Sequence, residues 1–268
     1  MIPIFIGTSD TEDYWIERIL AYTLLKNTKE KISITWLRPK HFPDWNKEGW
    51  GTPFTNFRYA VPHLMNHKGK AIYMDCDQIN FKDIAELYEI DLEGKAMGMV
   101  WDALMWNGEE WRDTPHDRGF FCDSLMLIDC EKQGKIIGDI SRVKNARRGL
   151  KMEIFDQLGM PEKDKGLVHI KELNPRWNSF DGKNTSYQPK GFEKGQEKNY
   201  RHVQAFQPDL PLEEIWHLHL TGLSTQPWHP TYNPWAKVHL DRDDILEVLW
   251  ELNRQVTMIE KREEFLND

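Results

Sequence analysis

The sequence is poor in the features that mark secreted, membrane-spanning and nucleic-acid-binding proteins. It has three cysteines in 268 residues, which is too few, and odd in number, for a disulfide framework. We therefore expect a reducing, cytoplasmic compartment. The N-terminus lacks the basic and apolar regions of a signal peptide. No stretch approaches the roughly 18 apolar residues of a membrane-spanning helix, so we expect no transmembrane segment.

Basic charge is scarce as well. Lys and Arg number 35 against 43 Asp and Glu, which gives a net charge of −8. Broad neutralisation of phosphates needs a basic surface, so we expect no stable nucleic-acid binding. There is no internal repeat and no low-complexity tract. The hydrophobic fraction of 40% and the charged fraction of 29% are those of an ordinary globular protein, and the length suits one large domain.

Apolar runs and amphipathic segments alternate along the chain. The runs 2–7, 31–37, 70–75, 95–102 and 121–131 predict buried strands, with a last strand within 213–222. Helical spacing predicts helices over 13–28, 54–67 and 83–90, and a C-terminal helix from 241. Residues 131–170 read as helix and loop, and 174–200 as a polar loop. This order predicts an α/β fold, a mixed sheet flanked by helices in a single domain.

The stretch AIYMDCD, residues 71–77, places Asp75 and Asp77 directly behind a predicted buried strand. Two carboxylates that leave a buried strand together repel each other and are costly to desolvate. A divalent cation removes both problems, and hard oxygen ligands suit Mg²⁺ or Mn²⁺. The alternative is a simple turn. A second Asp-x-Asp, Asp241 and Asp243, precedes the C-terminal helix, where helix capping explains it.

The segment 51–102 resembles glycosyltransferase family 8, including its bacterial and phage-type relatives. The resemblance rests on Arg58, Gly69, the Asp75–Asp77 pair, Ile79 and the DIAEL stretch at 83–87. Four further stretches are similar to family motifs in the same order: IPIFIGTSD (2–10), FCDSLMLIDCE (121–131), LNPRWNSFDG (173–182) and HLHLTGLSTQPWHP (217–230).

The resemblance implies a GT-A fold and the transfer of a sugar, with retention, from a nucleotide-sugar donor to a carbohydrate or other hydroxyl acceptor. It favours a UDP-linked donor and Mn²⁺, with Mg²⁺ as the second candidate, bound by Asp75, Asp77 and His219. It also implies a catalytic domain over 1–240, in which 1–130 binds the nucleotide sugar and 131–240 contributes the acceptor side and the late metal-binding motif. Residues 241–268 form a helix packed on that domain.

Further site residues follow from the same resemblance. The expected donor-binding residues are Gly7, Thr8, Ser9, Asp10, Arg58, Asp75, Cys76, Asp77, Asn178, Gly222 and Gln226. The expected catalytic residues are Asp102, Asp123 and Gln157. Structural roles remain as alternatives. Residues 8–10 could cap the following helix without contacting a ligand, and His219 could be a structural histidine.

Two positions depart from the family pattern. Asp123 stands where the family usually has small or amide residues, and Gln226 stands where it has a diphosphate-binding lysine. Other functions therefore remain as alternatives: a nucleotide-sugar hydrolase, a nucleotidyltransferase, or a non-catalytic nucleotide-sugar-binding protein. A nucleotidyltransferase is expected to carry a Gly-rich, basic loop after the first strand, which TSDTEDYW (8–15) lacks.

Overall fold

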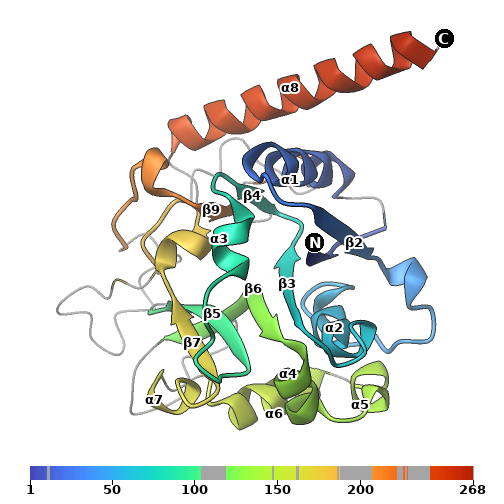
Figure 1. The fold of residues 1–268 in the computed structure, drawn as a ribbon, viewed down its shortest axis with the longest axis vertical. Helices are drawn as coiled ribbons and strands as arrows, with labels where there is room; N and C mark the ends of the chain where they lie inside the picture. Colours follow the sequence, from blue (N-terminus) through green and yellow to red (C-terminus); the bar gives the residue numbers. More distant parts are fainter. Residues whose placement is uncertain are drawn as a thin grey trace.

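A six-stranded mixed sheet forms the centre of the computed structural model (Figure 1), with strand order β2-β1-β3-β6-β5-β7. The structure describes residues 1–10, 13–103, 119–146, 148–160, 163–185, 187, 207–221, 226, 228 and 242–267. The strands are β1 (Ile2–Gly7), β2 (Ile32–Leu37), β3 (Lys70–Asp75), β5 (Met97–Asp102), β6 (Phe120–Asp129) and β7 (Ile170–Leu173). Strand β6 is antiparallel to β3 and β5, and the other pairs are parallel.

A second, three-stranded sheet continues from the end of β3. Its strands are β4 (Gln78–Asn80), β8 (Ser179–Phe180) and β9 (His217–His219), in the order β4-β9-β8. Gln78 pairs with His219 in the antiparallel register of β4 and β9, and the N–H of Leu220 donates to the carbonyl of Asp77 over 2.9 Å. This register brings the late histidine beside the paired aspartates, about 140 residues earlier in the chain.

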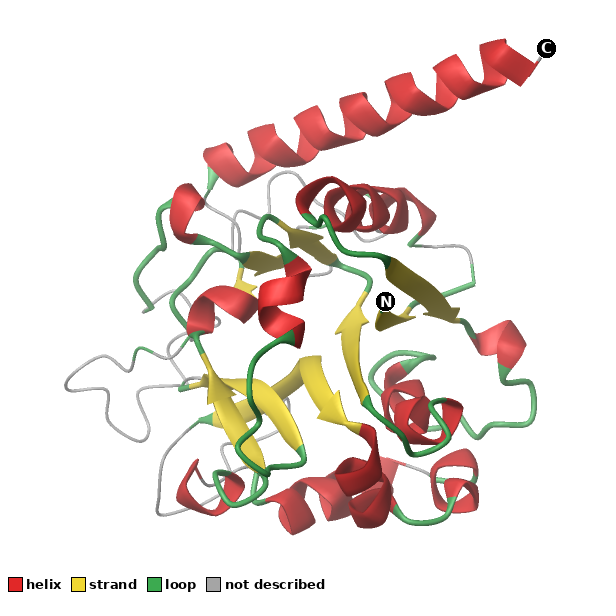
Figure 2. Ribbon diagram, viewed as in Figure 1, coloured by secondary structure: helices red, strands yellow, loops and turns green. Residues whose placement is uncertain are grey.

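Helices surround the two sheets (Figure 2). The α-helices are α1 (Tyr14–Asn27), α2 (Val61–Leu64), α3 (Ile84–Tyr88), α4 (Cys130–Ile137), α5 (Ile140–Lys144), α6 (Arg148–Leu158), α7 (Lys163–Gly166) and α8 (Asp243–Asn267). The 3₁₀ turns are η1 (Pro39–His41), η2 (Thr55–Ala60), η3 (Pro175–Asn178) and η6 (Leu212–Glu214). Helices α4, α5 and α6 gather at one end of the molecule, and α1 and α8 lie at the other (Figure 1).

The C-terminal helix α8 packs on α1, as its amphipathic pattern predicts. Ile245 and Leu249 are buried in a core cluster that also contains Ile16 and Ile19 of α1. The Tyr22 hydroxyl of α1 donates to Gln255 over 3.0 Å. The far end of α8 extends beyond the rest of the molecule in Figure 1. Among the described helices, none has the length and apolar character needed to cross a bilayer.

Two predicted elements differ from the structure. Residues 54–67, expected as helical with Pro62 early in the helix or at a break, form the 3₁₀ turn η2 followed by the four-residue helix α2. All six residues of η2 are buried, and Pro62 has no N–H to donate within a longer helix. The last strand, expected within 213–222, is only β9, because its partners β4 and β8 are themselves three and two residues long.

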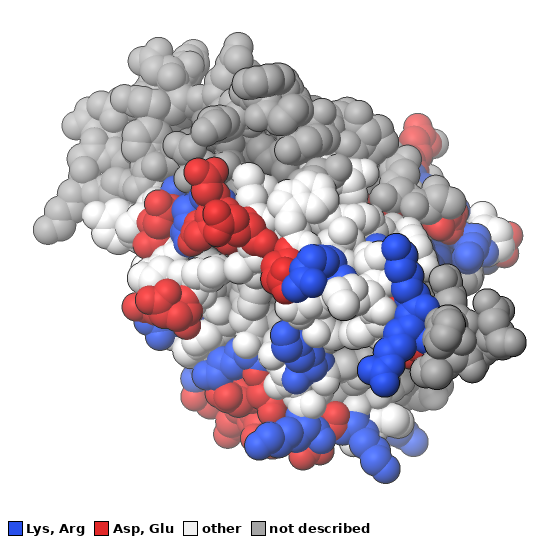
Figure 3. All heavy atoms as spheres, turned by 90° about the horizontal axis from the view of Figure 1, so that it is seen from above, with Lys and Arg blue, Asp and Glu red and all other residues white. Residues whose placement is uncertain are grey.

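Charges of both signs are mixed on the surface seen from above in Figure 3, among the described residues of that face. Ion pairs occur on the surface among the described residues, such as Lys82 with Glu86 and Arg254 with Glu251. Such exposed pairs contribute little to stability. The described residues in Figure 3 form no broad surface of one sign.

Candidate active site

Asp75, Asp77 and His219 meet where the chain passes from the central sheet into the small one. One possible ligand atom from each lies within 4.8 Å of the others. His219 Nε2 is 3.3 Å from Asp77 Oδ1. Asp75 ends β3, Asp77 precedes β4 and His219 ends β9, so backbone pairing fixes all three positions.

Burial and the charges of neighbouring groups shift the pKa values of the cluster. Burial raises the pKa of Asp75; Arg58 opposes this shift, and Asp77 adds to it. Burial alone would lower the pKa of His219, but the attraction of Asp77, Asp75 and Asp181 outweighs it and the pKa is raised. A divalent cation at this point would relieve the repulsion between the carboxylates.

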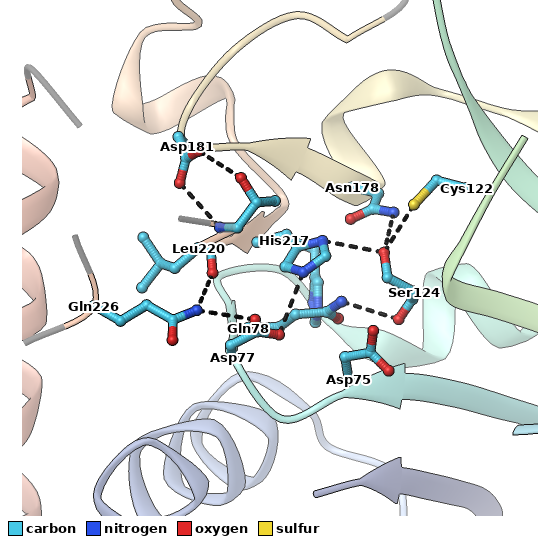
Figure 4. A network of polar contacts seen from close by, with 12 residues as sticks. Asp75, Asp77, Gln78, Cys122, Ser124, Asn178, Asp181, His217, Leu220 and Gln226 are labelled. Carbon is cyan, nitrogen blue, oxygen red and sulfur yellow. Dashed lines mark hydrogen bonds and ion pairs between the residues drawn. The ribbon is translucent and has the colours of Figure 1, made fainter. Parts of the chain in front are cut away.

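Asp77 is held from the side away from His219. The Gln226 amide donates to Asp77 Oδ2 over 3.0 Å and to the carbonyl of Leu220 over 2.5 Å (Figure 4). Within the described part of the chain, the buried Oδ1 of Asp77 receives no hydrogen bond. An orphaned carboxylate oxygen beside an imidazole nitrogen fits a divalent cation with oxygen and nitrogen ligands.

Arg58 is enclosed between two carboxylates rather than open to a ligand. Its Nε donates to the carbonyl of Thr55 over 2.9 Å. Its Nη1 donates to the carbonyl of Asp123 over 2.8 Å and lies 2.7 Å from Asp123 Oδ1. Its Nη2 donates to both oxygens of Asp75 over 3.0 and 3.1 Å. A guanidinium has five N–H groups, and these contacts use all five, so Arg58 orients Asp75 in this structure.

Two buried tyrosines complete this arrangement. The Tyr59 hydroxyl donates to Asp123 Oδ2 over 2.9 Å, and the Tyr73 hydroxyl donates to Asp75 Oδ1 over 2.6 Å. Burial, the largest cause, raises the pKa of both phenols well above their usual range. Both hydroxyls therefore stay protonated and act as hydrogen-bond donors. Gly7 lies under Tyr73, because a Cβ at that position would overlap the Tyr73 hydroxyl. The structure thus gives Gly7 a packing role beside the site.

The end of β1 lies next to the paired aspartates. Gly7 is in register with Asp75, and the N–H of Cys76 donates to the carbonyl of Gly7 over 3.1 Å. The Thr8 hydroxyl donates to Glu17 of α1, and Glu17 is paired with Arg38. Thr8 is fully buried, so its side chain ties β1 to α1.

Ser9 and Asp10 have helix- and loop-capping contacts. The N–H of Ser9 donates to Asp13 Oδ2 over 3.1 Å, and the N–H of Asp13 donates to Ser9 Oγ over 3.1 Å, a reciprocal arrangement like a capping box. Asp10 Oδ1 accepts from the backbone N–H of Lys40 over 3.1 Å. Asp10 is exposed, so its second oxygen can also meet a ligand.

The remaining candidates are dispersed. Asp102 is buried at the end of β5, at the edge of the sheet where β3 also ends, and accepts from Gln207 over 3.1 Å. Gln157 lies on the exposed side of α6 and donates to Glu153, and α6 is well separated from β4 and β9 in Figure 1. The structure does not bring Gln157 to the cluster, because α6 buries Ile154, Phe155 and Leu158 instead. Gly222 lies outside the described residues.

Ser124, Gln78 and His217 lie at the site but were not predicted from the sequence. Asn178, which was predicted, donates to Ser124 Oγ over 3.0 Å. Gln78 donates to the carbonyl of Ser124 over 2.9 Å, so its Oε1 faces His217 Nε2 at 2.7 Å. Burial lowers the pKa of His217 to about 3, which makes it a neutral structural histidine.

Comparison with known proteins supports the family resemblance. The family model described as "Glycosyl transferase family 8" matches residues 7–135, a range that contains Arg58 and both aspartates of the cluster. Over this range, just under half of its length, the chain is similar to family 8 glycosyltransferases. The family resemblance expected from the motifs is thereby confirmed.

The individual relative is distant. The chain is 25% identical over 138 residues to general stress protein A of Bacillus subtilis (strain 168), and the match covers 46% of this chain and 44% of that protein. The match therefore spans less than half of that relative's length.

Solved structures show the same fold. A galactosyltransferase LgtC in complex with donor and acceptor sugar analogues has a TM-score of 0.58 at 14% identity, covering 95% of this chain and 96% of that one. The apo form of glycosyltransferase GlyE from Streptococcus pneumoniae TIGR4 has a TM-score of 0.52 at 19% identity, covering 94% of this chain and 60% of that one. The expected GT-A-type mixed α/β fold is confirmed.

Proposed function

We propose that the protein transfers a sugar from a UDP-linked donor to a carbohydrate or other hydroxyl acceptor, with retention and with Mn²⁺ held by Asp75, Asp77 and His219. The observation that carries the proposal is the convergence of these three side chains within 4.8 Å, at the end of a strand inside the region that matches the family. Mg²⁺ is the second candidate ion, since carboxylate oxygens also suit it.

The chain's own residues give this site its order. A bound ion would stabilise, as a Lewis acid, the charge that develops on the departing diphosphate. Gln226 holds Asp77 by one oxygen and leaves the other facing His219. Arg58 and Tyr73 hold Asp75 by hydrogen bonds. Ligands fixed in this way need no reorganisation when the charge develops, which is the main source of electrostatic catalysis.

The donor is proposed to lie along the edge of the sheet at which β1, β3 and β5 end. The exposed Asp10, which follows the buried Thr8 and Ser9 at the end of β1, would contact its nucleoside, because Gly7 is in register with Asp75 and ligands of α/β sheets bind at the carboxyl ends of strands. Asp102 would face hydroxyls of the sugar, and Asn178 and Gly222 would complete the donor site. Asp123 is proposed to act through Arg58. Gln157 is left out because α6 lies apart from this edge, and no covalent nucleophile is assigned.

The proposal includes a cellular compartment and a domain division. We place the enzyme in the cytoplasm, since Cys76, Cys122 and Cys130 are buried free thiols. We also retain the division into a catalytic domain and the helix α8, whose proposed boundary at residue 240 lies outside the described residues.

The test is calorimetric titration of UDP, and separately GDP, into metal-stripped protein with and without added Mn²⁺. The variant is Asp77→Ala, and the matched control is Asp243→Ala, which changes the exposed aspartate of the second Asp-x-Asp pair. We expect UDP binding that requires Mn²⁺, is lost in Asp77→Ala and is kept in Asp243→Ala.

UDP binding that is the same with and without Mn²⁺, and the same in Asp77→Ala, would contradict the proposed site. The anomeric configuration of the product, followed by NMR from a UDP-sugar that binds, tests retention. Release of free sugar at the same rate with and without any acceptor would assign the enzyme to hydrolysis instead.

A further inference from the structure

The side chain of Ser124 lies at the centre of the polar network behind the cluster (Figure 4). Ser124 is on β6 and is 4% exposed. Its Oγ is 3.0 Å from His219 Nδ1, 3.0 Å from Asn178 Nδ2 and 3.1 Å from Cys122 Sγ. The opposite nitrogen of the same imidazole, His219 Nε2, faces Asp77.

The directions of these three hydrogen bonds follow from what each group can donate. A serine hydroxyl has one proton and two lone pairs. The Asn178 amide N–H fills one lone pair. If His219 ligates an ion through Nε2, its proton is on Nδ1, and that N–H is directed at the second lone pair of Ser124. The proton of Ser124 is then left for Cys122 Sγ, a weak acceptor.

We propose that Ser124 is a positioning residue for the metal site: by accepting the Nδ1–H of His219, it selects the tautomer in which Nε2 presents a free lone pair towards Asp77. A histidine can ligate a metal only through a nitrogen that carries no proton, and the hydrogen bond at the other nitrogen decides which one that is. The inference rests on the proposed metal-binding function and deepens it.

The proposal predicts a loss of metal affinity without a loss of fold. Removing the partner that orients a metal-binding histidine typically weakens metal binding by about 10- to 100-fold. Ser124→Ala removes only the hydroxyl and should show a weakening of this size. Ser124→Thr keeps a hydroxyl and should recover most of the affinity. Ser33→Ala, the same change on the outer strand β2, is the matched control and should bind like the wild type.

The first measurement is Mn²⁺ binding to the full-length, metal-stripped protein without nucleotide, followed by the electron paramagnetic resonance signal of free Mn²⁺. Thermal melting of each variant is recorded beside it. A second measurement needs no variant of Ser124: the ¹⁵N NMR signals of His219 in protein loaded with Zn²⁺ as a diamagnetic probe, assigned by their absence in His219→Gln. We expect the proton on Nδ1.

The outcomes separate the inference from the proposed function. If wild-type protein binds no Mn²⁺, the proposed metal site fails and the inference fails with it. If wild type binds Mn²⁺ and Ser124→Ala binds it equally well, only the inference is overturned. A lower melting temperature of Ser124→Ala with unchanged Mn²⁺ affinity would assign Ser124 a purely structural role. A proton on Nε2 in the Zn²⁺-loaded protein would also overturn the inference.

Discussion

Replacement of Asp123 by Asn is expected to destabilise the fold strongly, because Asp123 balances a buried arginine. Asp123 Oδ1 lies 2.7 Å from Arg58 Nη1, and Oδ2 accepts from the Tyr59 hydroxyl over 2.9 Å. An Asn side chain keeps one oxygen and turns an NH₂ group towards either Arg58 or Tyr59, both of which are donors there. At least one of the two hydrogen bonds is therefore lost.

The loss of stability in Asp123→Asn depends on the contacts that Arg58 keeps. Breaking a buried ion pair by removing one partner costs about 3–5 kcal/mol. Arg58 keeps its contacts with Asp75 and with the backbone carbonyl of residue 123, which favours the lower end, about 3 kcal/mol. For a chain of this size, 1 kcal/mol moves the melting temperature by roughly 2–4 °C. We thus expect a fall of about 6–12 °C.

Melting curves of the wild type, Asp123→Asn, Tyr59→Phe and the double variant provide the assay. Tyr59→Phe alone removes one hydrogen bond to a charged group and should cost about 1.5–3 kcal/mol. The double variant should cost less than the sum, because the two side chains share one contact. A melting temperature of Asp123→Asn within about 2 °C of wild type, combined with lost transferase activity, would refute this reasoning and return Asp123 to the catalytic residues.

Three further changes test other parts of the site. Gly7→Ala places a methyl group against the Tyr73 hydroxyl and should lower stability by about 1–3 kcal/mol, measured by urea unfolding. Burial raises the pKa of Asp181 to about 6. The protonated carboxyl therefore stabilises the fold fully below about pH 4, and this stabilisation is lost as the pH rises through about 6. Relative to Asp181→Asn, the wild type should lose about 3 kcal/mol of folding stability over this range in metal-free protein. Gln226→Lys should weaken Mn²⁺ binding in the absence of nucleotide several-fold, by calorimetry, because it adds a positive charge beside Asp77.

Much of the fold and the paired aspartates were predictable because they depend on local patterns. Apolar runs and helical spacing predicted β1, β2, β3, β5 and β6 and the helices α1 and α8, while the four-residue strand β7 was missed. Two aspartates behind a buried strand need a compensating charge wherever that strand lies. His219 entered only through the family resemblance, since nothing in its own neighbourhood separates it from His217. The structure makes that distinction by pairing Gln78 with His219 and by burying His217 against Gln78 and Asn80.

The roles of Arg58, Tyr73 and Ser124 could not be read from the sequence, because each depends on which side chain of another element it meets. A free guanidinium suits a phosphate or ribose, and only the fold shows that Thr55, Asp75 and Asp123 occupy its donors. For Tyr73 a signal existed: two residues before Asp75 on one strand, it must share the same face. Of the small sheet, β4 and β8 were missed, because strands of two or three residues leave no periodic pattern.

Gln226 is uncharged, which is consistent with the acidic residues around it. Asp75 and Asp77 belong to the cluster and Asp181 lies close enough to act on His219, while Arg58 is committed to Asp75 and Asp123. A cation bound to this group would find uncompensated negative charge, which favours it. The Gln226 amide orders Asp77 by a hydrogen bond without adding a charge of its own. A lysine there would compete with a bound cation for Asp77. If the protein acts as proposed, Gln226 would leave neutralisation of the diphosphate to that ion.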